Sequence, residues 1–116
     1  MVDGEILLLR MSGPLTASTL AGFAADAVES HGHRAKGFIL DYRPGVIVAT
    51  ADELGRMLAS VPEASPLRRP GAFVGDPGKI STLRVHALRM AKAGFRRRVF
   101  IDTLTAHDWI LDRLRV

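Results

Sequence analysis

The chain has 116 residues, no cysteine, 47% hydrophobic and 24% charged residues, and a formal net charge of +4. This length suits one domain, residues 1–116, whose composition is far from that of disordered chains. The lack of cysteine excludes disulfides, thiolate metal sites and cysteine nucleophiles. The N-terminus does not resemble a signal peptide, and the apolar runs ILLL and VIVA cannot span a bilayer, so we expect a cytoplasmic protein.

Positive charge is concentrated in the second part of the chain. Residues 1–65 contain 5 Lys/Arg against 8 Asp/Glu, whereas residues 66–116 contain 11 against 4, which gives net charges of −3 and +7. A basic region of this kind attracts phosphate groups, nucleic acid or membrane surfaces, but a solvated basic face is the commoner explanation.

Hydrophobic periodicity predicts four strands and four helices in alternation. Strands are expected at residues 5–13, 36–42, 71–75 and 97–102. Thr16 or Ser18 caps the first expected helix, and Gly32 ends it in a left-handed conformation. The other helices are expected at residues 50–61, 80–93 and 105–114. This alternation indicates an α/β domain with a largely parallel sheet.

Four stretches of sequence carry a resemblance to a known family. They are MSGPLTAST after the first strand, LDYR and VGDP at the ends of the next two, and the closing VFIDTLTAHDWIL, with Asp102, Ala106 and Trp109. Together they resemble the bacterial SpoIIAA-like proteins, which belong with the STAS domains and are related to the CRAL-TRIO lipid-transfer domains. The resemblance implies a mostly parallel sheet of four to five strands with about four flanking helices. Relatives usually have an additional strand before the equivalent of EILLLR, so the first strand is expected to be an open edge that pairs in a homodimer.

Asp41 and Arg43 follow the second expected strand, at the edge of the sheet where α/β domains bind ligands. Asp41 is either a ligand-binding group or a side chain that ties down its own loop, and the second role is favoured. Arg43 is the better binding candidate, because its planar guanidinium matches carboxylate or phosphate.

Thr50 stands where the resemblance places the phosphorylated serine of STAS regulators. Here only Thr50 offers a hydroxyl, because the segment reads Val48-Ala49-Thr50-Ala51-Asp52. Thr50 and Glu53 also have the spacing of a capping box, and the acidic residues of the first turn would repel a phosphate. The cap is therefore favoured over the phosphorylation site.

The segment GVIVA places Val46, Ile47 and Val48 in what the pattern indicates is a loop, where polar residues are expected. Under the relation to lipid-transfer domains, these residues, Met57 and residues of the third helix border an apolar pocket with a basic mouth. The alternative is that residues 43–50 and the neighbouring helix faces dock a partner protein.

The third expected helix carries Arg84, Arg89 and Lys92, and an arginine triplet follows it. Arg89, Lys92 and Arg96 share one helical face, which suits an acidic partner or anionic lipid headgroups in peripheral contact with a membrane. Nucleic acid is disfavoured, since this face lacks aromatic residues and no nucleic-acid-binding signature accompanies it.

No set of residues suggests a metal, a cofactor or a reaction. GDPGKIST lacks the spacing of a phosphate-binding loop, although Lys79 and the following helix start keep an anion or nucleotide site as an alternative. His31 and His33 lack a third ligand. We expect a non-catalytic regulatory or binding domain that acts through a protein partner or an apolar, lipid-like ligand. The alternative is an enzyme or anion-binding domain that uses Asp41, Arg43 and Lys79.

Overall fold

The computed structural model describes residues 6–32 and 34–114, which form an α/β domain. The main sheet has four parallel strands in the order β1-β3-β5-β6, namely β1 (Ile6–Arg10), β3 (Gly37–Asp41), β5 (Gly71–Val74) and β6 (Arg97–Phe100). A second, two-stranded parallel sheet joins β2 (Gly13–Leu15) and β4 (Gly45–Ile47). The helices are α1 (Ala17–His31), α2 (Ala51–Ala59), the short 3-10 helix η2 (Pro66–Arg68), α3 (Ile80–Lys92) and α4 (Thr103–Leu114).

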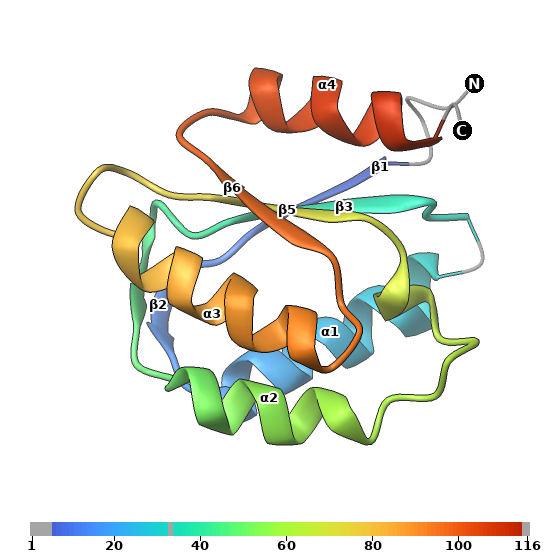
Figure 1. Cartoon of the computed structure of the whole chain (residues 1–116), viewed down its shortest axis with the longest axis horizontal. Helices are drawn as coiled ribbons and strands as arrows, with labels where there is room; N and C mark the ends of the chain where they lie inside the picture. Colours follow the sequence, from blue (N-terminus) through green and yellow to red (C-terminus); the bar gives the residue numbers. More distant parts are fainter. Residues whose placement is uncertain (1–5, 33, 115–116) are drawn as a thin grey trace.

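The helices cover the two faces of the main sheet unequally. Figure 1 shows α4 alone on one face, while α1 and α3 lie on the other and α2 lies beyond them, farthest from the sheet. The alternation of side chains along the strands supplies both cores. Phe73 of β5 packs among the residues of α1, α2 and α3, whereas its neighbours Ala72 and Val74 pack under Ala106 and Ile110 of α4. The predicted α/β domain, with a mostly parallel sheet flanked by helices, is therefore confirmed, and the helices cover both faces of the sheet.

The pair of strands β1 and β3 bends and continues as the pair β2 and β4. The bend uses Gly13, which has a φ of +76° that other residues rarely adopt. It also uses Gly45, where a Cβ would lie 2.7 Å from the Met11 carbonyl oxygen. The prediction of a loop at GVIVA was wrong in this respect, because Gly45–Ile47 is a strand. The signal was absent because a three-residue strand is too short for a periodicity.

Several predicted boundaries agree with the structure, and others shift. Thr16 caps α1 by accepting a hydrogen bond from the Thr19 N–H at 3.1 Å. Gly32 ends α1 with right-handed angles, φ −55° and ψ −37°, so the expected left-handed conformation was wrong. Instead, Gly94 takes the left-handed conformation, with φ +88°, just after α3. The predicted start of the first strand at residue 5 and the second histidine of the HGH triplet, His33, lie outside the described residues.

β1 is an edge strand of the main sheet, as expected, and its pairing with a second subunit stays a prediction. None of the helices in the described part of the chain combines the length and the apolar character that crossing a membrane requires.

Candidate functional site

Asp41 and Arg43, at the end of β3, form a closed ion pair. Two hydrogen bonds of 2.9 Å join the guanidinium to the carboxylate, from Nε to Oδ1 and from Nη2 to Oδ2. The Arg43 backbone N–H also donates to Oδ1, at 3.1 Å. Asp41 is buried, while the Arg43 side chain is 39% exposed. Asp41 therefore ties down its own loop, the role that the sequence favoured.

The electrostatics of Asp41 agree with this structural role. Burial raises the pKa of Asp41, but the hydrogen bonds and charge of Arg43 outweigh it, and Arg10 adds to their effect, so the pKa lies below the ordinary value of 3.8. The carboxylate is thus ionised at neutral pH and has its acceptors occupied by Arg43, which leaves no free base at this strand end.

Lys79, the alternative anion-binding residue, is also occupied. Its ammonium donates to the Asp76 carboxylate at 2.8 Å and to the Arg43 carbonyl at 3.0 Å. The hydrogen bond from Lys79 lowers the pKa of Asp76 below 3.8. The loops after β3 and β5 are thereby linked to each other, and the charged groups at this edge of the sheet mainly satisfy one another.

Thr50 is the N-cap of α2 and one half of a capping box. Its hydroxyl accepts from the Glu53 N–H at 3.1 Å, and the Glu53 carboxylate accepts from the Thr50 N–H at 2.9 Å. These contacts, foremost the backbone hydrogen bond from Thr50, lower the pKa of Glu53 below 4.5. The predicted cap is confirmed, and the Thr50 oxygen is already engaged.

Val46, Ile47 and Val48 divide between the surface and the core. Val46 is 63% exposed and Val48 53% exposed, whereas Ile47 packs against the core on the α1–α3 side. Neither of the two valines lines the apolar cavity described next, and their place at an apolar pocket stays a prediction. The alternation of β4 turns them outward because it turns Ile47 inward.

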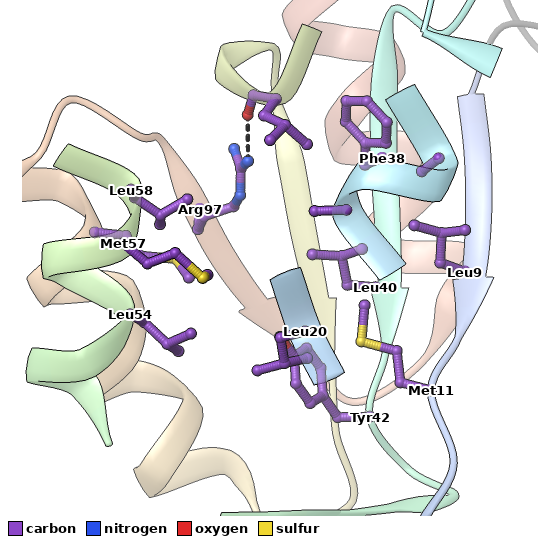
Figure 2. Close-up of a pocket in the computed structure, with 14 residues that line it drawn as sticks. Leu9, Met11, Leu20, Phe38, Leu40, Tyr42, Leu54, Met57, Leu58 and Arg97 are labelled. Carbon is purple, nitrogen blue, oxygen red and sulfur yellow. Dashed lines mark hydrogen bonds between the residues drawn. The ribbon is translucent and has the colours of Figure 1, made fainter. Parts of the chain in front are cut away.

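An apolar cavity of about 70 Å³ lies between the sheet and helices α1 and α2. Figure 2 shows Leu54, Met57 and Leu58 of α2 on one side, and side chains from the strands on the other. The lining comprises Leu9, Met11, Leu20, Ala24, Ala27, Phe38, Leu40, Tyr42, Leu54, Met57, Leu58, Leu67, Met90 and Arg97. Met57 was predicted at such a pocket, and Met90 belongs to the third helix, as expected.

Arg97 is the cation among these lining residues. Its guanidinium donates to the carbonyls of Leu67 at 2.5 Å, Arg69 at 3.0 Å and Arg96 at 3.0 Å. Burial lowers the pKa of Arg97 to about 10, although the nearby Tyr42 opposes this shift, so the group stays charged at neutral pH. Strand alternation is a signal that could have found it, since Arg97 lies two residues before the inward-facing Val99.

Tyr42 contributes a polar group at the other end of the cavity in this view (Figure 2). The residue is 2% exposed, and its ring packs edge-on against Phe73 at 5.4 Å. Burial raises the pKa of Tyr42 well above 10, so the phenol is neutral. In the described part of the chain no hydrogen bond to its hydroxyl is found, and this oxygen is not one of the fully buried atoms that lack a partner, so solvent can reach it. A donor is therefore available to a ligand.

Arg89 does not face outward as a free cation. Its Nε lies 3.4 Å from the Asp52 carboxylate of α2, and its guanidinium occupies the space above Gly55. Arg89 thus attaches α2 to α3, and the exposed face of α3 is formed instead by Arg84, Val85 and Leu88. Arg89 is thus partly exposed and paired, whereas Lys92 and Arg96 are exposed, and a shared binding face of the three stays a prediction.

Within the described ranges, no three His, Asp or Glu side chains come together as a metal site would require. His86 is buried in α3, and its Nδ1 has no hydrogen-bond partner among those residues. Burial lowers the pKa of His86 below 6.5, so the ring is neutral at neutral pH.

Asp41→Asn is expected to lower the free energy of unfolding by about 1–3 kcal/mol at neutral pH, because the amide loses the charge that faces Arg43. Since the folded-state pKa is depressed, the carboxylate stabilises the fold above its unfolded-state pKa, and this contribution is lost as the pH falls through the folded-state pKa. The difference from wild type should therefore shrink below about pH 4 in urea unfolding curves. Asp26→Asn on exposed α1 is the control, and a difference for Asp41→Asn that is constant with pH would contradict the assignment.

Thr50→Ala is expected to lower the free energy of unfolding by about 1 kcal/mol, because α2 loses its cap. Thr50→Ser retains the hydroxyl and should unfold at nearly the wild-type urea concentration. Equal stability of all three proteins would show that the capping box contributes nothing.

No family model, no curated protein and no solved structure matches this chain. The resemblance to SpoIIAA-like proteins thus stays a prediction, carried by the sequence pattern.

Proposed function

We propose that the chain is a non-catalytic, cytoplasmic binding domain of the SpoIIAA-like type, and that it holds a small apolar ligand with one hydrogen-bond-accepting or anionic group. The observation that carries this proposal is the apolar cavity, whose lining residues include Tyr42 and the charged Arg97. An apolar wall with a few polar groups is the usual composition of a small-molecule site. The absence of catalysis is supported by the closed contacts of Asp41, Arg43 and Lys79.

The size of the cavity limits the part of the ligand that enters. Engineered apolar cavities of about 150 Å³ hold benzene, and about 70 Å³ is smaller. Met11, Met57 and Met90 line the cavity, and unbranched methionine side chains adapt to the shape of what they contact. A short alkyl group therefore fits after side-chain movement, whereas a long lipid chain also requires α2 to move outward.

Hexanoate and hexan-1-ol are suitable probes for this site. Either should shift the ¹³C-methyl signals of Met11, Met57 and Met90 in NMR spectra, with tighter binding of hexanoate because its carboxylate accepts from the Tyr42 hydroxyl and is attracted over a longer distance by the charge of Arg97. Ala24→Leu extends into the cavity from α1 and should abolish the shifts, while Ala25→Leu on the exposed face of the same helix should not. Tyr42→Phe should leave stability unchanged and weaken hexanoate binding by about tenfold. Equal shifts in Ala24→Leu and wild type, or none with either probe, would refute the cavity as a ligand site.

A protein partner that docks beside β4 is the second candidate function. Val46 and Val48 favour it, because two large apolar side chains are exposed next to each other on a strand and its continuation. Arg43 lies on the same loop, but its guanidinium is already bound to Asp41. We therefore place the centre of this surface on the valines rather than on the arginines.

A photo-crosslinking residue at position 46 tests this docking surface in cells. We expect it to form a covalent adduct with one protein, whereas the same residue at Glu29, exposed on α1, should not. If neither position, or both equally, gave the adduct, specific docking at β4 would be refuted.

A further inference from the structure

A second concave region lies where β5 and β6 begin, at the opposite end of the strands from Asp41. This basic groove has a volume of about 430 Å³ and is lined by Arg68, Pro70, Arg96, Trp109 and Arg113. Four segments supply it, since Arg68 ends η2, Pro70 precedes β5, Arg96 precedes β6, and the other two residues belong to α4. The volume lies within the range of about 300–1,000 Å³ that small-molecule sites occupy.

The three arginines of the basic groove have no carboxylate partner within residues 6–32 and 34–114. Arg68 donates to the carbonyls of Val61, Pro62 and Ala93, which are neutral groups. The guanidinium of Arg113 lies 5.4 Å from the ring centroid of Trp109. The side chain of Arg96 is exposed, and it makes neither a hydrogen bond nor an ion pair with those residues. Three positive charges thus border one groove, and no carboxylate of the described residues pairs with them.

The acidic residues nearest in sequence to Trp109 and Arg113 belong to a different surface. Asp108 and Asp112 of α4 line the neighbouring groove with Arg98 and Phe100, and neither borders the basic groove. Trp109 borders both grooves. A concave site with charge of one sign and low-dielectric walls concentrates its field on the enclosed space.

We propose that the basic groove binds a phosphoryl group. Guanidinium groups match the geometry of phosphate oxygens with paired N–H donors, which Arg96 and Arg113 can supply. Arg68, whose three nitrogens already donate to carbonyls, adds its positive charge. The phosphoryl group belongs either to a soluble metabolite or to a lipid headgroup. This site lies apart from the apolar cavity and does not depend on its ligand.

Trp109 is the single tryptophan of the chain, so its fluorescence reports directly on the basic groove. Titration with inorganic pyrophosphate should give a saturable change in emission, and Arg96→Ala should weaken the apparent affinity by about tenfold. Arg84→Ala removes the same charge from exposed α3, outside the groove, and should leave the affinity within about twofold of wild type. Isothermal calorimetry repeats the comparison for Arg113→Ala, because that variant also changes the surroundings of Trp109.

Phosphatidylcholine vesicles with and without phosphatidic acid distinguish the two sources of the phosphoryl group. Saturation by pyrophosphate indicates a soluble ligand, and a response only to vesicles that contain phosphatidic acid indicates a headgroup. A response to neither probe would overturn the proposal. Equal weakening by Arg96→Ala and Arg84→Ala would also overturn it, since it would show general attraction to a basic protein.

Discussion

At the end of the main sheet where its strands begin, backbone carbonyls need hydrogen-bond donors, and arginine side chains supply them. Arg68 binds carbonyls just beyond α2 and α3, and Arg69 binds those of Gly32 and Ala35 beyond α1. Arg97 binds the carbonyl of Leu67, which lies in η2, and that of Arg69, which follows it. In an α/β domain the helices run antiparallel to the strands, so the negative ends of α1, α2 and α3 gather here. An arginine side chain donates several hydrogen bonds to the carbonyls and brings a positive charge to the negative helix ends. The segment between α2 and β5 depends on these contacts.

This arrangement explains the uneven charge of the chain. A helix C-terminus carries about half of a negative charge, so three helix ends compensate only part of the charge of three guanidiniums. Arg96 and Arg113 add further positive charge at the same edge. At the opposite edge, Asp41 and Asp76 are paired with Arg43 and Lys79. A large part of the positive charge of residues 66–116 is thus located at one end of the strands, which is why an anion is expected there.

Sequence patterns predicted the helices and strands in which the spacing of apolar residues repeats over two or more turns or alternations. The helix 80–93 is found at Ile80–Lys92, and the hydroxyl and carboxylate of Thr50 and Glu53 are spaced as the cap requires. Contacts between distant segments were not predicted. Nothing in the local pattern shows that Arg89 reaches Asp52, 37 residues away, or that the Arg97 guanidinium turns to carbonyls of residues 67 and 69. A long flexible side chain can reach many partners, so its position in the sequence does not determine which one it contacts. The short side chain of a helix cap reaches only the N–H groups of the first turn.

The attachment of α2 determines what the apolar cavity can accept. α2 lies farthest from the sheet and forms one wall of the cavity with Leu54 and Leu58 (Figures 1 and 2). It is joined to α3 partly by the Arg89–Asp52 pair, which lies near the surface and contributes little to stability. Gly55 permits this contact, because a Cβ there would lie 2.4 Å from Arg89 Cζ. Glycine inside a helix costs stability, but Leu54 and Leu58 hold α2 in place because they are buried in the core on this side of the sheet. A larger ligand therefore enters only if these two leucines leave their packed positions.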